Sequence, residues 1–193
     1  DEYKVMGLAP YGKPIYLNAL REILHLEEDG TFFLNLTFFR HHNEKVSYEW
    51  KGGEPKVGDL FKAEKLENLL GFARRNKDDS LEQNHKDLAC SIQAMYEEAF
   101  FNLLNYCYKK YGVNSLTLAG GCAMNSVANG KVQLRSPFEK IYVQAAAGDA
   151  GGAIGAAMTI WNELSGNRPK PMLHAYLGPK FSSGDINSIL ESN

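Results

Sequence analysis

The pattern of hydrophobic and polar positions predicts a mixed α/β chain with one dominant helix. Between residues 84 and 111, apolar side chains recur at spacings of three and four, the period of an amphipathic helix. These positions are Leu88, Ile92, Tyr96, Ala99, Leu103 and Cys107. Ser80-Leu-Glu-Gln83 resembles a capping box before the helix, and Gly112 suits a C-cap after it. Such a helix is about 40 Å long at 1.5 Å per residue, enough to support a whole sheet.

Shorter patterns predict a β-hairpin ahead of this helix. Segments 21–27 and 31–39 have a β-rich composition, and the turn signal Glu28-Asp-Gly30 separates them. His41 and His42 follow. Adjacent histidines in a strand point to opposite faces, so we interpret this pair as surface residues rather than ligands of one metal ion.

The remaining elements before the long helix are less regular. The chain opens, over 2–14, with a helical turn that leads into a loop, because Pro10 and Pro14 forbid a continuous helix. After the hairpin we expect a short strand, a loop and a helix, over 46–50, 52–58 and 59–75.

Two stretches downstream each combine a short apolar strand, glycines and a helix. In the first, strand 115–119 leads to Gly120 and Gly121, which allow a tight turn with nothing projecting above it. A helix predicted over 122–129 would then direct its free N–H groups into that space, which favours polar or anionic ligands.

The second stretch repeats this arrangement. Strand 140–144 precedes Asp149, which stands where a helix over 149–164 is predicted to start. Polar residues at the carboxyl ends of neighbouring strands form ligand clefts in open α/β sheets. We therefore predict that Asn125 and Asp149 share one cleft with the two glycines.

Composition limits the class of protein. The 193 residues suit one domain, or one domain and a piece of another, and the formal net charge of −2 gives no footprint for nucleic acid or an anionic membrane. Cys90, Cys107 and Cys122 have no metal-like spacing, so we expect reduced, mostly buried thiols. Reduced thiols favour a cytoplasmic protein, and we find no signal peptide and no apolar run long enough to span a bilayer. The start without Met and the end within a helical pattern lead us to expect a fragment.

Five groups of residues resemble the O-carbamoyltransferase family, which includes nodulation-factor and antibiotic carbamoyltransferases. They are Glu2-Tyr-Lys-Val-Met-Gly-Leu-Ala-Pro-Tyr-Gly-Lys-Pro14, His85-Lys-Asp-Leu-Ala89 with Ser91-Ile-Gln-Ala94, Leu118-Ala-Gly-Gly-Cys-Ala-Met-Asn125, Ala147-Gly-Asp-Ala-Gly-Gly-Ala153 and Tyr176-Leu-Gly-Pro179. The resemblance covers nearly the whole chain. The amino-terminal domain of these enzymes is similar to the tRNA threonylcarbamoyl-transferase proteins.

The resemblance implies a fold and a reaction. The fold is an α/β fold, the second lobe of an actin-like or sugar-kinase-like (ribonuclease H-like) ATPase, with 1–172 as a partial transferase lobe. Residues 173–193 would begin the carbamoyl-adenylate-forming domain. There, carbamoyl phosphate and ATP give carbamoyl-adenylate, and the lobe described here then passes the carbamoyl group to a hydroxyl of a sugar or natural-product acceptor. A homodimer is a possible assembly, with no nucleic-acid or membrane partner.

The resemblance also implies roles for single residues. Asn125 would touch the nucleotide, the Gly120–Gly121 backbone would line its pocket, and Gly12 would lie near the adenosine. Asp149 would be a ligand of a divalent metal, implied to be iron, beside the phosphate. The family's metal-binding histidine pair and glycine-rich loop belong to segments outside this chain, so we expect an incomplete metal site and no catalysis by the fragment alone.

Several alternatives stay open at this stage. Asp149 suits an N-cap, and Asn125 suits a cap or a bond to neighbouring backbone. Cys122 beside the glycines suggests a nucleophile, but no histidine is placed to activate it, which favours a small buried residue. An ATP-dependent sugar-kinase-like phosphotransferase and a non-enzymatic interaction domain are the competing functions.

Overall fold

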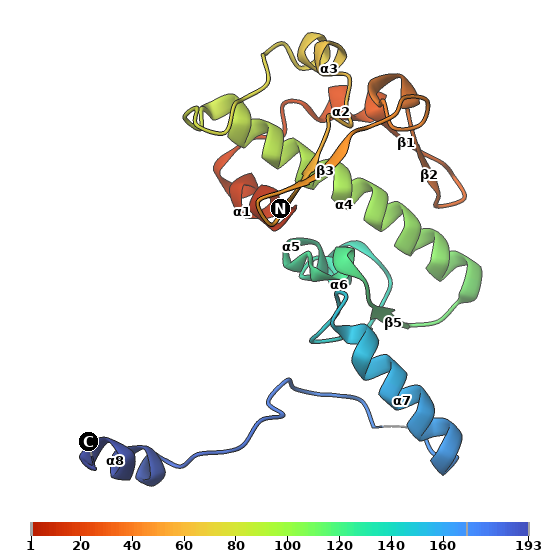
Figure 1. Ribbon diagram of the computed structural model, residues 1–193. Coiled ribbons are helices and arrows are strands. Elements are labelled where there is room, and N and C mark those ends of the chain that lie inside the picture. Colours follow the sequence, from red (N-terminus) through yellow and green to blue (C-terminus); the bar gives the residue numbers. More distant parts are fainter. Residues whose placement is uncertain (1, 169, 193) are drawn as a thin grey trace. The chain divides into compact units, whose positions relative to one another are not determined.

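The computed structural model describes residues 2–168 and 170–192 and divides the chain into two compact units (Figure 1). The first unit contains Asp1–Leu116 and Asn125–Ile141; the second contains Thr117–Met124 and Tyr142–Asn193. Within the described residues, each helix is too short or too polar to cross a bilayer.

The first unit is built around one long helix, α4 (Gln83–Tyr111). Helices α1 (Glu2–Leu8) and α2 (Leu17–Ile23) pack along it, joined by the 3₁₀ turn η1 (Ala9–Tyr11) (Figure 1). The other elements of the unit are β1 (Leu24–Leu26), β2 (Phe32–Leu34), η2 (Leu36–Phe38), β3 (Tyr48–Lys51), β4 (Glu54–Val57), α3 (Ala63–Leu70), α5 (Ser126–Asn129) and α6 (Val132–Arg135).

The ends of α4 agree with the prediction, but its cap differs. Gly112 ends the helix in the left-handed conformation, at φ 63°, as a glycine C-cap does. At the other end the N-cap is Glu82 rather than Ser80. The His85 backbone N–H donates to the Glu82 carbonyl at 3.2 Å, and His85 Nδ1 accepts from Glu82 N at 2.9 Å. His85 is half-buried, with its ring edge-on to Phe72.

The buried face of α4 is not the predicted apolar stripe. Ile92 and Leu103 are 39% and 44% exposed. The buried positions are Asp87, Ala89, Ser91, Gln93, Met95, Glu97, Phe101 and Leu104. Half of these are polar, because loops and helices pack on more than one side of α4 and hydrogen-bond to it. A search for apolar spacing alone therefore selected the wrong face.

The hydrophobic core lies at the carboxyl-terminal half of α4. Phe101 and Leu104 pack with Val132 and Phe138, and the flanking residues are Phe100, Tyr108, Leu116 and Ile141. Leu116 belongs to β5 (Ser115–Leu118) and Ile141 to β6 (Lys140–Val143), which pair in one two-stranded sheet. This confirms the predicted packing of the long helix against both strands.

The β1–β2 hairpin is confirmed but shorter than predicted. Its antiparallel register pairs Leu24 with Leu34 and Leu26 with Phe32. Residues 21–23 instead end α2, and 36–38 form the 3₁₀ turn η2. His41 and His42 lie exposed in a turn, so their surface position is as expected although they are not in a strand.

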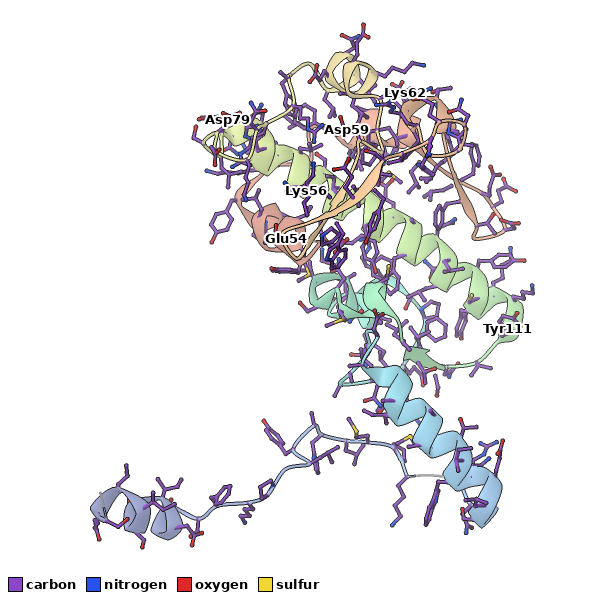
Figure 2. All side chains as sticks on the ribbon, viewed as in Figure 1. Glu54, Lys56, Asp59, Lys62, Asp79 and Tyr111 are labelled. Atoms are coloured by element: carbon purple, nitrogen blue, oxygen red, sulfur yellow. The ribbon has the colours of Figure 1, made fainter. Side chains whose placement is uncertain are left out.

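A second hairpin replaces the loop predicted over 52–58. Strands β3 and β4 pair through Gly52 and Gly53, whose φ values of 61° and 82° suit a tight hairpin turn. Because opposite residues share a face, one face carries Tyr48, Trp50, Pro55 and Val57 and the other carries Glu49, Lys51, Glu54 and Lys56 (Glu54 and Lys56 are labelled in Figure 2). Apolar and polar residues thus alternate along both strands, but Gly52 and Gly53 interrupt the pattern, which therefore favoured a loop.

The helix predicted over 59–75 is reduced to α3, Ala63–Leu70. Phe61 forms a β-bridge with Phe39, which keeps the preceding residues extended. Gly71, at φ 78°, ends the helix in the left-handed conformation. The predicted helix was therefore too long at both ends.

The second unit contains the glycine-rich segments and the end of the chain. A 3₁₀ turn, η3 (Gly121–Met124), replaces the start of the helix predicted over 122–129, which is interrupted at Asn125. Helix α7 (Gly151–Ser165) begins two residues later than predicted, and α8 (Ser183–Glu191) follows after a stretch whose described residues form neither helix nor strand. The described chain is thus mixed α/β with small sheets. The actin-like lobe and the boundary at residue 172 stay predictions.

Candidate functional site

Gly12 lies where a loop of the first unit meets the backbone of α4. A Cβ built on Gly12 would fall 2.0 Å from Lys86 O and 2.6 Å from Asp87 N. Separations under 3.0 Å do not occur for real Cβ atoms, and both neighbours are helix backbone. Glycine is therefore required here for the close approach of the loop to the helix.

Asp87 fixes the loop that carries Gly12. Its Oδ1 accepts from Lys13 N at 2.8 Å and from Gln83 Nε2 at 2.9 Å. These hydrogen bonds, first the one from the Gln83 side chain and then the one from the Lys13 backbone, lower the pKa of Asp87 because they stabilise its carboxylate. One turn further on, Ser91 Oγ accepts from Tyr16 N at 3.0 Å and donates to Asp87 O.

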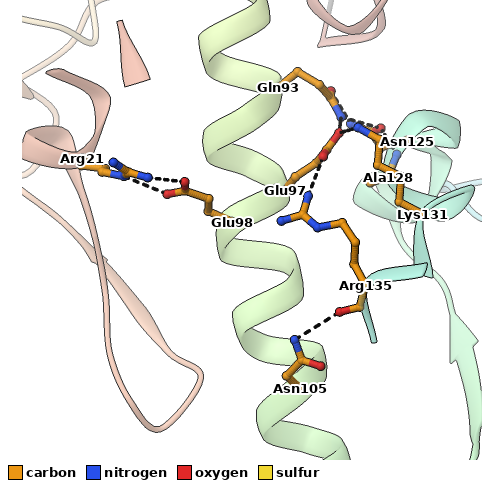
Figure 3. A network of polar contacts seen from close by, with 9 residues as sticks. All are labelled: Arg21, Gln93, Glu97, Glu98, Asn105, Asn125, Ala128, Lys131 and Arg135. Atoms are coloured by element: carbon orange, nitrogen blue, oxygen red, sulfur yellow. Dashed lines mark hydrogen bonds and ion pairs between the residues drawn. The ribbon is translucent and has the colours of Figure 1, made fainter. Parts of the chain in front are cut away.

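Asn125 is the N-cap of α5 and part of a buried polar network (Figure 3). Its Oδ1 accepts from Ala128 N at 3.0 Å. The side-chain amides of Asn125 and Gln93 form a reciprocal pair: Asn125 Nδ2 donates to Gln93 Oε1 at 2.9 Å, and Gln93 Nε2 donates to Asn125 Oδ1 at 3.2 Å. The capping alternative for Asn125 is therefore observed.

Glu97 anchors this network from inside α4. Its side chain is only 6% exposed and accepts from Gln93 Nε2 at 3.1 Å, while Lys131 Nζ and Arg135 Nη1 form ion pairs with its two oxygens (Figure 3). The Arg135 guanidinium also lies 4.3 Å from the centre of the Phe101 ring. The buried carboxylate thus has two cationic partners, Arg135 in α6 and Lys131 just before α6, and one amide partner, Gln93.

The second unit holds Gly120, Gly121 and Asp149. Gly120 has φ 98°, which side chains rarely adopt, and its N–H donates to Ala147 O at 2.7 Å. A Cβ on either glycine would meet nothing within 4 Å, so the space beside both is open. A turn of this kind exposes backbone to an approaching ligand.

Asp149 is exposed and does not cap α7. The N-cap is Ala150, in the right-handed helical conformation and without a side-chain cap, whereas Asp149 contributes its carbonyl to Gly152 N at 3.1 Å. The N-cap alternative for Asp149 is therefore wrong for this structure. Among residues 2–168 and 170–192, no three His, Cys, Asp or Glu side chains gather closely enough to hold a metal ion.

The cysteines are reduced, as expected, but are less buried than expected. Cys90 and Cys107 are half-buried and Cys122 is exposed. The pKa of the Cys90 thiol is raised, mainly by burial and further by the nearby carboxylates of Asp87 and Glu97. The interpretation of Cys122 as a small buried residue is wrong, because the turn η3 places it at the surface.

Comparison with known proteins places these segments in a family. Residues 1–158 match the model of the carbamoyltransferase N-terminus. The chain belongs to this family. The chain is 39% identical over 196 aligned positions to an uncharacterised protein of Synechocystis sp., with 98% of the chain and 30% of that protein covered.

Two named relatives are nodulation proteins. NolNO of Sinorhizobium fredii is 34% identical, with 95% of the chain and 24% of that protein covered; NolO of Bradyrhizobium diazoefficiens is also 34% identical, with 98% and 30% covered. The chain thus spans less than a third of the length of these curated relatives.

Within this carbamoyltransferase N-terminal region, two of the five predicted site residues lie in the first unit. Gly12 and Asn125 meet α4 through Asp87 and Gln93, six residues apart, or about 9 Å along the axis. Gly120, Gly121 and Asp149 lie in the second unit. The convergence of Asn125 and Asp149 with the two glycines on one cleft stays a prediction.

A pocket of the first unit lies away from the predicted residues. It has a volume of about 490 Å³ and a mostly apolar lining from α3 and its flanks. Arg74 and Asp59, an exposed ion pair, are among the residues that line it (Asp59 is labelled in Figure 2). None of the five predicted site residues lines this pocket.

Sequence reasoning assigned no role to Gln93 or Glu97. Their spacing of four residues places them on one side of a helix, which was the available signal. A glutamate in a helix is usually solvated, however, and its burial here depends on Lys131 and Arg135, which lie more than thirty residues away.

Proposed function

We propose that this chain is part of an ATP-dependent O-carbamoyltransferase. The full-length protein would make carbamoyl-adenylate from carbamoyl phosphate, water and ATP, with release of phosphate and pyrophosphate, and transfer the carbamoyl group to a hydroxyl of a small-molecule acceptor. The observation that carries the proposal is the family match over residues 1–158, which includes Gly12, Gly120, Gly121, Asn125 and Asp149.

In the transfer step, the acceptor hydroxyl oxygen forms a bond to the carbamoyl carbon. The bond between that carbon and the phosphate oxygen of the adenylate breaks, and AMP leaves with the electron pair. The hydroxyl proton passes to a base, which we do not assign to a residue of this chain. The products are the carbamoylated acceptor and AMP.

The residues of this chain would bind and orient the nucleotide. Asn125 would donate a hydrogen bond to it, and the exposed backbone at Gly120 and Gly121 would border its pocket, since a Cβ built on either glycine meets nothing within 4 Å among the described residues. Gly12 would bring its loop close to the adenosine. Its tight contact with Lys86 is a separate, structural reason for glycine.

A divalent metal, with iron as the implied ion, would act at Asp149. The exposed carboxylate fits a role as one oxygen ligand, and its position outside the N-cap leaves it available. The described residues contain no group of three potential ligands, so other parts of the full-length protein would supply the rest. When bound, the metal would neutralise phosphate charge.

The test uses the full-length protein with ATP, carbamoyl phosphate labelled in its carbonyl carbon, and a panel of sugars and polyols. We expect pyrophosphate release that depends on carbamoyl phosphate, and label in one class of acceptor. Formation of ADP and a phosphorylated sugar without carbamoyl phosphate would replace the proposal with the kinase alternative. Failure to bind ATP or AMP would favour an interaction domain.

A further inference from the structure

We infer that Gln93, held by Glu97, is a positioning residue that fixes the side-chain amide of Asn125 so that it presents one N–H to a hydrogen-bond acceptor of the nucleotide. The inference rests on the proposed function, because it concerns the residue assigned to the nucleotide there. It adds two residues to that site and specifies the chemical character of the ligand atom.

The orientation of both amides follows from their outer partners. The Glu97 carboxylate only accepts hydrogen bonds, so the nitrogen of Gln93, not its oxygen, must face it, at 3.1 Å. The Ala128 backbone N–H only donates, so the oxygen of Asn125 must face it, at 3.0 Å. The reciprocal pair between the two amides is the one arrangement consistent with both ends (Figure 3).

Glu97 makes this orientation stable. Lys131 and Arg135 pair with its two oxygens and hold this side chain, which is 6% exposed, in one position (Figure 3). Gln93 itself is buried at 8% exposure. Rotation of its amide by 180° would place its oxygen against Glu97, and such a mismatch in a buried site is costly.

The consequence concerns the hydrogen-bonding capacity left at Asn125. Its Oδ1 accepts two hydrogen bonds, from Ala128 N and Gln93 Nε2, and so has used its lone pairs. Its Nδ2 donates one hydrogen to Gln93 Oε1 and retains the other. Asn125 can therefore only donate to a ligand. The ligand atom must be an acceptor, such as a ribose or phosphate oxygen or a ring nitrogen, and not the exocyclic amino group of adenine.

The test compares variants of the full-length protein in two measurements, pyrophosphate released and carbamoyl group transferred to the acceptor. Asn125→Asp keeps the N-cap but removes the donor, since aspartate caps as well as asparagine. Gln93→Met keeps the approximate shape but removes the amide. Asn102→Leu is the matched control, because it removes a polar side chain of the same helix that donates to Glu27 O instead.

We expect Asn125→Asp and Gln93→Met each to lower the ratio of transfer to pyrophosphate release about tenfold, the factor for one hydrogen bond of ordinary strength. The double variant should lose little more than either single variant, because both changes remove the same donor. Asn102→Leu should leave the ratio unchanged. Glu97→Gln should also lower the ratio, because an amide at position 97 can both donate and accept and so no longer fixes the orientation of the Gln93 amide.

Each other outcome overturns a defined statement. If Asn125→Asp lowers the ratio while Gln93→Met behaves like Asn102→Leu, the positioning role is wrong and the proposed function stands. Additive losses in the double variant would make Gln93 an independent structural residue. A normal ratio in Asn125→Asp would remove both the inference and the nucleotide role of Asn125, although carbamoyl transfer itself would persist. If Gln93→Met does not melt cooperatively and is therefore not folded, the ratio measured for Glu97→Gln tests the positioning role instead.

Discussion

The backbone oxygen of Lys86 lies 2.0 Å from the point that a Cβ of Gly12 would occupy. The Tyr11-Gly12-Lys13 loop is thus seated directly on α4, and Gln83 Nε2 donates to Tyr11 O at 3.2 Å beside it. Gly12 therefore has a structural role that is independent of any nucleotide.

We predict that Gly12→Ala destabilises the protein by about 1–3 kcal/mol or more, because neither helix backbone atom can move aside and the loop must shift. Urea unfolding measures the change. Gly7→Ala is the control, since a Cβ there meets nothing within 4 Å and alanine suits the helix α1 better than glycine. Equal stability of the two variants would contradict the seating of the loop.

A second prediction concerns acid stability through Asp87. Its pKa is lower in the folded chain than in the unfolded chain, so the stabilisation is complete above the unfolded value near about 3.9. It disappears as the pH falls through the lower, folded pKa. Asp87→Asn keeps an oxygen for Lys13 N but has no charge. The difference in urea midpoint between wild type and variant should therefore be largest near neutral pH and should disappear in acid. A gap that is constant with pH would exclude a role for the charge.

The ion pairs of Glu97 predict a non-additive loss. Lys131 and Arg135 are 40% and 42% exposed, so removing either one alone should cost about 0–1 kcal/mol, as at other solvated pairs. The double variant Lys131→Met/Arg135→Met leaves a buried carboxylate without a cation, and should cost up to about 3–5 kcal/mol. Thermal unfolding of the three variants gives the coupling. A double variant equal to the sum of the single ones would show that Glu97 is solvated in solution.

The thiols should differ in reactivity. Cys122 is exposed, whereas Cys90 is half-buried and its pKa is raised by burial, so less of it is thiolate at a given pH. We expect Cys122 to react first with a disulfide reagent at pH 8, and Cys122→Ser to remove the fast phase. Cys90→Ser should leave that phase in place. A fast phase that persists in Cys122→Ser would contradict the surface position of the turn η3.

Local signals in the sequence predicted those elements that depend only on their own residues. The capping glycine Gly112 and the repeated apolar spacing located α4, and Glu28-Asp-Gly30 located the first hairpin. What failed depended on partners distant in sequence. The bridge between Phe39 and Phe61 shortened a helix, and ion pairs from Lys131 buried Glu97 on a face that periodicity alone marks as exposed. Propensity does not contain such contacts.

The same distinction applies to the candidate site. The glycines could be located because their conformations are local: Gly120 has φ 98° and precedes an open turn. The capping by Asn125 was one of two open alternatives, and its pairing with Gln93 joins positions 32 residues apart. The N-cap alternative for Asp149 failed because the helix α7 begins at Gly151, where a Cβ would lie 2.2 Å from Ala146 O. That close approach sets the position of the first turn.

The final prediction concerns Asp149 as a metal ligand in the full-length protein. Since Ala150 occupies the N-cap position, replacing the Asp149 carboxylate by an amide removes no cap, and the melting temperature should stay the same. An amide is a weaker ligand than a carboxylate for a divalent cation, so Asp149→Asn should lose metal and acceptor carbamoylation together. Pyrophosphate release dependent on carbamoyl phosphate should survive, because the proposal places that step in another domain.

The matched control for this prediction is Glu163→Gln, which neutralises another exposed carboxylate of the same unit, within α7. Metal content after gel filtration and label in the acceptor are measured for both variants. Metal and transfer retained in Asp149→Asn at an unchanged melting temperature would leave Asp149 without a role in the site. Loss in both variants would instead point to the net charge of the unit, since the two substitutions share only the removal of one negative charge.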